Sequence, residues 1–264
     1  MKPIRVVVHG VQGKMGQEVA RAVRREPGVK LIGAVELNPA SDCLLLPDGS
    51  DSVPFSSDLE DILERCQPDV LIDFTTALAT MSAARTATPR GTNLVIGTTG
   101  LTAEDINEID RLAIANGVGA VVAPNFALGA ILLIHIAKIC ARYLDYAEIM
   151  ELHHHLKADA PSGTAIATAK AMAEARDKPF RQPPQPQKPQ GSRGQQIEGI
   201  TVHSVRLPGI IARQEVLLGG PGQTLSLKHD ATSRECYMPG VILATKEVTK
   251  LKGLVYGLDS LLGL

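Results

Sequence analysis

The sequence predicts an α/β protein whose first half forms a doubly wound parallel sheet and whose second half is α+β with an open mixed sheet. Three observations predict this class. Up to about residue 125, β-branched runs alternate with helical stretches, which implies parallel strands and right-handed crossovers. A turn with three glycines joins the first strand to the first helix. After residue 190, strand-like runs follow one another without helices between them. The first half is therefore Rossmann-like.

The elements of the first half are predicted from hydrophobic periodicity. The run from Val6 to Val8 is the apolar centre of a first strand, and Val19 and Val23 lie one turn apart on a first helix. The same criteria predict strands at 4–9, 29–36, 70–74, 94–96 and 119–123, and helices at 14–25, 57–65, 77–86 and 103–116.

The second half is predicted from helical runs, glycine turns and one biased segment. Residues 178–189 are rich in proline and glutamine, which predicts a mobile surface loop without an assigned role. Glycine and proline turns separate the strand-like runs, so antiparallel pairing is expected there. Helices are predicted at 127–143, 163–175 and 241–251, and antiparallel strands at 200–207, 210–218 and 224–228.

The composition excludes several classes of protein. A net charge of −1 over 264 residues argues against nucleic acid or an anionic membrane as a partner, because both require a basic face. Four scattered cysteines without a C-x-x-C pair indicate neither a zinc knuckle nor a disulfide framework, so a reducing cytoplasm or equivalent compartment is expected. The N-terminal apolar run is too short for a signal peptide. Residues 127–137 are too few to span a bilayer and predict a buried helix.

A nucleotide-binding motif is predicted where the first strand turns into the first helix. The run Gly10-Val11-Gln12-Gly13-Lys14-Met15-Gly16 lets a pyrophosphate approach the backbone and the positive end of the helix dipole. Gln12 stands where the usual G-x-G-x-x-G pattern has its second glycine. Glu36 ends the next predicted strand, twenty residues after Gly16, where an acid holds the adenosine ribose.

Glu36 also bears on the choice between NADH and NADPH. A carboxylate at this position hydrogen-bonds the ribose hydroxyls of NAD and repels a 2′-phosphate. The neighbouring Leu37 supplies no cation to offset that repulsion, and Lys14 is the nearby basic candidate in the glycine turn. On these residues alone, both NADH and NADPH stay open as cofactors.

Three further loops follow predicted strands of the same sheet. In an open α/β sheet, ligands bind outside the carboxyl ends of the strands. Phe74-Thr75-Thr76 and Gly97-Thr98-Thr99-Gly100 stand at such ends and can line a nicotinamide with backbone groups and small hydroxyls. Ala123-Pro124-Asn125-Phe126 ends the last strand and leads into the second half. Each loop alone is typical of an ordinary turn, but together the three loops predict a rim around one ligand site at this edge of the sheet.

An anion site with proton donors is predicted near the middle of the chain. Three histidines, His153 to His155, and Lys157 directly precede a helix start in which Ser162 is a good N-cap. A helix N-terminus binds carboxylates, and histidine exchanges protons near neutral pH. If residues 151–157 are extended, His153, His155 and Lys157 share one face, and Asp159 orients the following loop. A metal site is the alternative, but neighbouring strand histidines diverge and no H-E-x-x-H helix accompanies them, so none is expected.

At this point the residues resemble a known family, the 4-hydroxy-tetrahydrodipicolinate (dihydrodipicolinate) reductases. The resemblance runs in order over essentially the whole chain, and its histidine–lysine segment is highly specific. It implies NAD(P)H-dependent formation of tetrahydrodipicolinate on the diaminopimelate route to lysine. The motifs are Gly10-x-x-Gly13-Lys14-Met15-Gly16, Ile96-Gly97-Thr98-Thr99-Gly100, Asn125-Phe126 and Glu151-x-His153-His154-x-x-Lys157-x-Asp159-Ala160-Pro161-Ser162-Gly163-Thr164-Ala165.

The resemblance also implies roles for individual residues. It makes His153 the catalytic acid and Lys157 its cationic partner at the substrate. The substrate carboxylates are then held by His154 and by the backbone of Ser162, Gly163 and Thr164. The implied cofactor residues are Gly10, Gln12, Gly13, Lys14, Met15, Gly16, Glu36, Gly97, Thr98, Thr99, Ala123, Asn125 and Phe126.

The organisation of the chain follows from the same resemblance. Residues 1–125 and about 240–264 are expected to form a dinucleotide-binding domain, and residues 126–239 a domain for substrate binding and oligomerisation. The family is typically a homotetramer built through the substrate-domain sheet. Many members carry a basic residue just after the ribose-binding acid, and Leu37 departs from this pattern, which argues against a strong NADPH preference.

Two other functions are alternatives to this hypothesis. A non-catalytic nucleotide sensor would not need proton donors concentrated at an anion site. A semialdehyde dehydrogenase would need an activated cysteine, and none of the four stands in a convincing setting. Both are less consistent with the sequence than a reductase.

Overall fold

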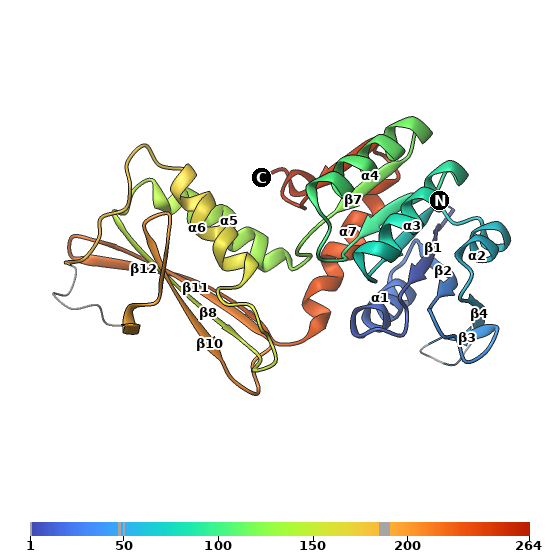
Figure 1. The fold of residues 1–264 in the computed structure, drawn as a ribbon, viewed down its shortest axis with the longest axis horizontal. Coiled ribbons are helices and arrows are strands. Elements are labelled where there is room, and N and C mark those ends of the chain that lie inside the picture. The colour runs from blue at the N-terminus through green and yellow to red at the C-terminus, as the bar shows by residue number, and fades with distance from the viewer. Residues whose placement is uncertain (1, 47–48, 50, 185–190) are drawn as a thin grey trace. The chain divides into compact units, whose positions relative to one another are not determined.

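The chain divides into two compact units in the computed structural model (Figure 1), which describes residues 2–46, 49, 51–184 and 191–264. The first unit comprises Met1–Phe126 and Tyr237–Leu264, so the chain returns to it at its C-terminal end. The second unit comprises Ala127–Cys236.

The first unit is built on an eight-stranded sheet in the order β13-β7-β6-β5-β1-β2-β4-β3. Neighbouring strands are parallel except β3 and β4. The direction of the strand order reverses between β1 and β5, and open α/β sheets bind ligands at such a switch point. The strands are β1 (Ile4–His9), β2 (Val29–Val35), β3 (Cys43–Leu45), β4 (Ser52–Ser56), β5 (Val70–Asp73), β6 (Asn93–Ile96), β7 (Gly119–Val122) and β13 (Gly253–Tyr256).

Helices in two groups accompany this sheet. Helix α3 contacts both α2 and α4, whereas α1 contacts α7. Strands β5 and β7 are buried over their whole length, because a sheet covered by helices has no solvent face. Local signals fix the helix ends: a capping box between Thr102 and Asp105 begins α4, and Gly117 ends it in the left-handed region. The helices are α1 (Lys14–Arg25), α2 (Leu59–Cys66), α3 (Ala77–Ala87), α4 (Ala103–Asn116) and α7 (Met238–Val248).

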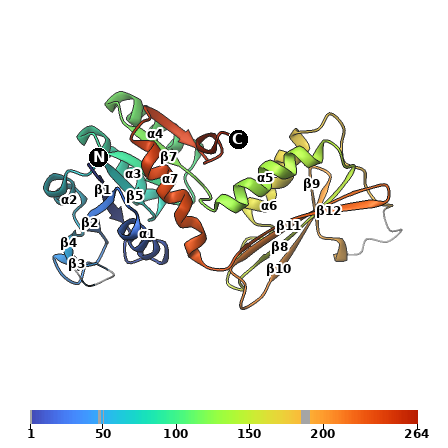
Figure 2. The same ribbon diagram turned by 180° about the vertical axis from the view of Figure 1, so that it is seen from behind.

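The second unit contains a five-stranded mixed sheet in the order β12-β11-β8-β10-β9. Strand β8 lies at its centre, antiparallel to β11 and parallel to β10. Helices α5 (Leu128–Ala141) and α6 (Gly163–Glu174) lie side by side in both ribbon views (Figures 1 and 2). The strands are β8 (Tyr146–His153), β9 (Gln195–Ile197), β10 (Ile200–Arg206), β11 (Ala212–Gly220) and β12 (Gln223–Ala231).

One face of this second sheet carries the core of the unit, and the opposite face is more open. Ile149 on β8 packs with Leu133 of α5 and Met172 of α6 in a shared hydrophobic cluster. Because side chains alternate along a strand, the neighbours of Ile149 point to the other face. On that face Tyr146 and Val205 are exposed.

The predicted fold class is confirmed, but the strand pairing of the second half was partly wrong. The run at 200–207 was expected to be antiparallel, whereas β10 is parallel to β8 and antiparallel only to β9. Strand β8 lies between β10 and β11, so the turn at Pro208-Gly209 does not make a hairpin. The short strands β3, β4, β9 and β13 were not predicted, because three to five residues carry too little periodicity to be recognised.

Two predictions about apolar or loop segments also need correction. The segment 127–137, expected to be a buried helix, exposes Leu132 and Ile136, and the same helix exposes Ile139 beyond that segment. The segment at 178–189 was expected to be a surface loop, yet Phe180 is only 4% exposed and packs in the core of the second unit. The guanidinium of Arg176 lies 4.2 Å from the centre of the Phe180 ring. Residues 185–190 of that segment lie outside the described part of the chain.

The described residues include no helix with both the length and the apolar character needed to cross a membrane.

Phe180 should contribute strongly to the stability of the second unit. Replacing it by alanine removes a buried ring and its contact with Arg176, and Phe→Ala changes in cores usually cost about 3–5 kcal/mol. Urea unfolding should show this loss for Phe180→Ala, whereas Leu156→Ala, which truncates an exposed side chain, should match the wild type within error. Equal stability of the two variants would contradict the packing described for Phe180.

Candidate active site

The glycine turn after β1 has the geometry of an anion-binding cradle. Gly10 lies at φ +80°, a region that favours glycine. A Cβ on Gly16 would lie 2.0 Å from the Gly10 carbonyl oxygen, so only glycine lets α1 start this close to β1. Gly13 is the N-cap of α1, and within the described chain no side chain caps that helix. The first turn of α1 therefore fits the pyrophosphate of a dinucleotide.

Glu36 lies at the edge of this glycine turn. Its carboxylate accepts hydrogen bonds from the backbone N–H of Gln12, at 2.9 Å, and from that of Leu37, at 3.0 Å. The side chain of Leu37 is 80% exposed, and Lys14 on the first turn of α1 is also exposed. The sequence predicted that Glu36 lies next to the motif. It did not predict that the carboxylate accepts a hydrogen bond from the Gln12 N–H.

The loops after β5 and β6 pack against each other and against the glycine turn. A Cβ on Gly97 would lie 2.1 Å from the Phe74 ring, and one on Gly10 would lie 2.8 Å from Cγ2 of Thr75. The Phe74 ring also lies 5.7 Å, centre to centre, from the ring of Phe126. The structure therefore brings together several of the predicted cofactor residues at the carboxyl edge of the first sheet. Ala123 joins them through its N–H, which donates to the Ile96 carbonyl at 3.0 Å.

Asp73 lies beneath these loops and was not singled out by sequence reasoning. It is the last residue of β5 and is 1% exposed. Its carboxylate accepts hydrogen bonds from Thr75 and Thr98 and contacts Nδ1 of His9. An isolated acid at the end of a buried strand carries no periodic signal, so the sequence pattern does not mark Asp73 as a site residue.

In the second unit, β8 ends at His153, and the predicted extended run is interrupted there. Residues after His153 turn, and the N–H of Lys157 donates to the His154 carbonyl at 3.1 Å. His153, His155 and Lys157 therefore do not share the face of one strand, as extension through residue 157 would have required. The N–H of Leu207, which follows β10, donates to the His153 carbonyl at 3.0 Å, and the chain then turns toward α6.

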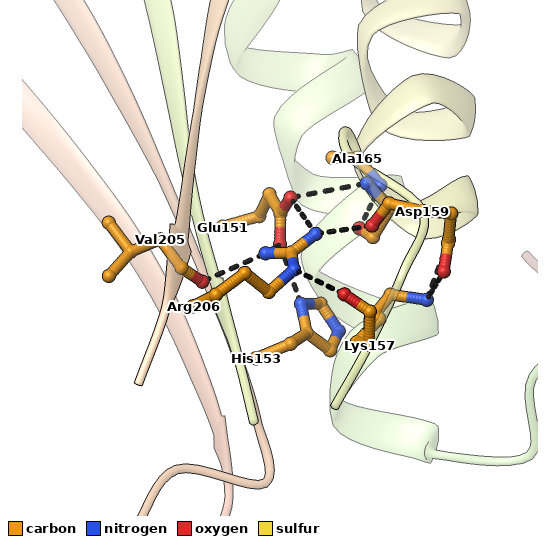
Figure 3. A network of polar contacts seen from close by, with 8 residues as sticks. Glu151, His153, Lys157, Asp159, Ala165, Val205 and Arg206 are labelled. Carbon is orange, nitrogen blue, oxygen red and sulfur yellow. Dashed lines mark hydrogen bonds and ion pairs between the residues drawn. The ribbon is translucent and has the colours of Figure 1, made fainter. Parts of the chain in front are cut away.

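Glu151 is the centre of the polar network around His153 (Figure 3). It is fully buried, and its carboxylate lies 2.5 Å from Nδ1 of His153. Arg206 makes two contacts to the two carboxylate oxygens, at 3.0 and 2.9 Å, and the N–H of Ser162 donates to Oε1 at 3.2 Å. Burial alone would raise the pKa of Glu151, but hydrogen bonds from His153, Arg206 and Ser204 outweigh it and lower that pKa to about 2. The carboxylate is therefore charged at neutral pH.

Arg206 also holds the loop that carries Lys157. Its guanidinium donates to the backbone carbonyls of Lys157, at 3.2 Å, and Asp159, at 2.5 Å (Figure 3). The same guanidinium thus joins β10, the Glu151 carboxylate and the loop before α6. Sequence reasoning missed Arg206, because it lies 55 residues from Glu151 in the chain and stands in an ordinary strand pattern.

The ammonium of Lys157 is held by Asp159. Its Nζ lies 2.6 and 2.7 Å from the two Asp159 carboxylate oxygens. This hydrogen bond is the main reason that the pKa of Asp159 is lowered. Lys157 is partly buried, whereas Asp159 is exposed, so an incoming anion can reach the pair from solvent.

The N-terminus of α6 and several cations lie near this network. The hydroxyl of Ser162 caps the helix by accepting a hydrogen bond from the Ala165 N–H at 3.2 Å. The backbone N–H of Ser162 donates to the Glu151 carboxylate. A Cβ on Gly163 would meet nothing within 4 Å, so the first turn is open on that side. Desolvation and then the charges of His153 and Arg234 lower the pKa of His154. The positive surroundings suit an anionic ligand, and Arg234 is a further cation that sequence reasoning did not name.

Comparisons with known proteins agree over the whole chain. Two family models match it: dihydrodipicolinate reductase, N-terminus, over residues 4–126, and dihydrodipicolinate reductase, C-terminus, over residues 129–262. A 4-hydroxy-tetrahydrodipicolinate reductase of Dehalococcoides mccartyi is 53% identical over 264 residues and covers 100% of both chains. One of Moorella thermoacetica is 47% identical over 98% of each chain. A dipicolinate-bound dihydrodipicolinate reductase structure from Paenisporosarcina sp. TG-14 superposes with a TM-score of 0.86 at 39% identity, covering 98% of this chain and 99% of that one.

The buried charge of Glu151 should make the stability of the chain depend on acid pH. Because the pKa falls from 4.5 to about 2 on folding, the stabilisation is complete above about pH 4.5 and is lost as the pH falls toward 2. Urea unfolding from pH 7 to pH 3 should therefore show a steeper decline for the wild type than for Glu151→Gln. At pH 7 the variant should be less stable by about 3 kcal/mol, the scale of a broken buried ion pair.

The matched control for this measurement is Glu174→Gln, at the end of α6 and outside the network. It should follow the wild-type curve. Parallel curves for the wild type and Glu151→Gln would contradict the charged state assigned to Glu151.

Proposed function

The chain belongs to the dihydrodipicolinate reductase family, and on that premise we propose that it reduces 4-hydroxy-tetrahydrodipicolinate to tetrahydrodipicolinate with NADH or NADPH, in the diaminopimelate pathway of lysine biosynthesis. The observation that carries the proposal is the Glu151–His153 pair at the end of β8, next to Lys157 and the open start of α6. This arrangement supplies a proton donor and an anion site for a small dicarboxylate. The resemblance inferred from the sequence motifs is confirmed.

The chemistry of the substrate explains why an acid is needed. The substrate is a cyclic dicarboxylate, and after loss of water its conjugated C=C–C=N system can accept a hydride at one end. The bound nicotinamide cofactor supplies that hydride. Negative charge then develops on the remaining atoms of the conjugated system, and a proton delivered there lowers the barrier.

We assign the delivery of this proton to His153. Its Nδ1 is committed to the Glu151 carboxylate, so Nε2 is the nitrogen that delivers the proton. The contact with the buried Glu151 carboxylate fixes the orientation of the ring. Glu151 and Arg206 thus act on the reaction through His153 and the loop, as positioning residues, and do not themselves contact substrate.

Lys157 and the start of α6 are assigned to the negative charges of the substrate. When a carboxylate enters, Lys157 can exchange its partner Asp159 for the ligand, because the Asp159 side chain faces solvent. His154, Ser162, Gly163 and Thr164 are the further carboxylate-binding residues that we propose, with Arg234 adding positive charge.

The first unit is assigned to the cofactor, and we propose that NADH is preferred over NADPH. The cradle of Gly10, Gly13 and Gly16 fits a pyrophosphate, and Glu36 stands where the ribose hydroxyls bind. A 2′-phosphate would meet the Glu36 carboxylate, whereas the exposed Leu37 supplies no charge to bind it. The loops of Phe74, Gly97 to Thr99 and Ala123 to Phe126 complete the proposed cofactor site.

We further propose that the chain assembles as a homotetramer in the cytoplasm or an equivalent reducing compartment. The open face of the second sheet, with Tyr146 and Val205 exposed, is the candidate surface for assembly. All four cysteines are free thiols, which is consistent with a reducing compartment.

A coupled absorbance assay tests the proposed activity. Pyruvate and aspartate semialdehyde are condensed by a dihydrodipicolinate synthase, the purified chain is added, and oxidation of NADH or NADPH is followed at 340 nm. Rapid oxidation that requires the synthase supports the proposal. Tight nucleotide binding without any oxidation would overturn it and favour a nucleotide sensor.

Loss of either proposed catalytic group should reduce turnover sharply. Removing a general acid or a charge stabiliser typically costs about a hundredfold or more, so His153→Ala and Lys157→Ala should each lower kcat by that factor. His155→Ala, which removes the exposed neighbouring imidazole, is the matched control and should keep most of the activity. Near-normal kcat in both test variants would remove these residues from the mechanism.

Glu36 should determine the ratio of the two cofactor affinities. Glu36→Ala removes the acceptor for the ribose hydroxyls and also the repulsion toward a 2′-phosphate, so Kd for NADH should rise more than Kd for NADPH. Isothermal titration calorimetry with each nucleotide measures the ratio. An equal change in both Kd values would reject this role.

A further inference from the structure

One buried carboxylate joins three loops of the proposed cofactor site. Asp73 ends β5 at the carboxyl edge of the first sheet, where the strand order reverses between β1 and β5. Its Oδ1 accepts hydrogen bonds from Thr75 N at 2.9 Å, Thr75 Oγ1 at 2.7 Å, Thr80 Oγ1 at 3.1 Å and Thr98 Oγ1 at 2.9 Å. Its Oδ2 lies 2.9 Å from Nδ1 of His9. Every oxygen of this carboxylate is therefore engaged by a donor.

Three of the donor residues come from different strand ends, each directly before or within a loop of the site, and the fourth, Thr80, lies in α3. His9 ends β1 and precedes Gly10, Thr75 follows β5, and Thr98 follows β6. Thr98 also accepts the Thr75 N–H at 2.9 Å, so the loops after β5 and β6 are joined to each other as well as to Asp73. The close approach of Gly10 to Thr75 means that a shift of one loop displaces the next.

Asp73 remains charged although it is buried. Burial alone would raise its pKa, but the hydrogen bond and charge of His9 and the hydrogen bonds of Thr75 and Thr98 outweigh burial and lower the pKa. A buried charge is seldom the most stable solution, because apolar residues of the same volume often stabilise a fold as well or better. Its location directly below the loops that meet the nucleotide points instead to a role in shaping that site.

His9 is the part of this arrangement that can be altered without disrupting the core. Its side chain is 14% exposed, and it borders a hollow of about 520 Å³ lined also by Ser57, Ala79 and Ser82. The two carboxylates on the rim of that hollow, Asp58 and Glu60, belong to the start of α2, where Asp58 accepts backbone N–H groups of the helix. The carboxylate that contacts the His9 ring is that of Asp73.

We infer that Asp73 and His9 are positioning residues for the dinucleotide: their hydrogen-bonded contact holds the loops after β1, β5 and β6 in the arrangement that binds NADH or NADPH. This inference rests on the proposed function of the first unit. It assigns no contact between Asp73 and the nucleotide. It requires that both nucleotides depend on the pair to the same degree, because the loops bind parts that NADH and NADPH share.

Equilibrium binding to the full chain tests the inference without requiring turnover. Kd for NADH and for NADPH is measured by calorimetry for the wild type, His9→Leu, His9→Asn and Thr98→Val. Losing a hydrogen bond to a buried charge should weaken binding by about tenfold, so His9→Leu should raise both Kd values by a similar factor. His9→Asn keeps an N–H donor near the position of Nδ1 and should restore both within about twofold. Thr98→Val should raise both Kd values as well.

The design separates this inference from other effects. Arg85→Leu breaks an exposed ion pair with Glu108 in the same unit and is the matched control, expected to leave both Kd values unchanged. In the coupled assay, His9→Leu should raise KM for the nucleotide while kcat at saturation and KM for the substrate stay near the wild type. A merely structural role would instead lower the active fraction, and with it kcat, without moving Kd.

Each outcome bears on the inference. Unchanged Kd values in His9→Leu and Thr98→Val overturn it, and so does equal weakening in His9→Leu and His9→Asn, because the donor would then be irrelevant. A change in Kd for only one of the two nucleotides also overturns the inference, because it would indicate an effect on the region of Glu36, where NADH and NADPH differ. Failure of the wild type to bind either nucleotide would reject the proposed function itself.

Discussion

The buried charge of Glu151 is the interaction on which the proposed substrate site of this molecule depends. A carboxylate without water is stable only if donors surround it. Here those donors are His153 on the same strand, Arg206 on the neighbouring strand and the N–H of Ser162 at the start of α6. The requirement of one anion therefore fixes an imidazole, a guanidinium and a helix start in a single arrangement.

The two units repeat this solution with different partners. In each, a fully buried acid on a central strand collects donors from segments distant in the chain, and each acid faces Nδ1 of a histidine. In the first unit the histidine precedes the glycine turn, and in the second it is the proposed proton donor. A buried carboxylate fixes direction as well as distance, since its lone pairs admit donors only from limited angles. Both sites thus gain rigid orientation from a group that need not touch a ligand.

Features with local causes could be predicted from the sequence, and features with distant causes could not. The first strand and the glycine turn were predicted correctly because Val6 to Val8 and the three glycines are consecutive or nearly so. The parallel pairing of β10 escaped prediction because it depends on β8, about fifty residues earlier. Of the site, His153 and Lys157 stood out as a cluster. Arg206 and Asp73 did not, because each is recognisable as a site residue only from hydrogen-bond partners that are distant in the sequence and close in the fold.

The hydrogen bond between Glu36 and the Gln12 N–H links the cofactor choice proposed for Glu36 to the shape of the glycine turn. An acid that only repelled a phosphate could be replaced freely during evolution or redesign. This one also holds the turn, so a chain adapting to a phosphorylated nucleotide must keep an acceptor at position 36 while gaining a cation nearby. A glutamine at 36 together with an arginine at 37 meets both demands. Replacements at position 36 are therefore limited to side chains that can still accept the Gln12 N–H.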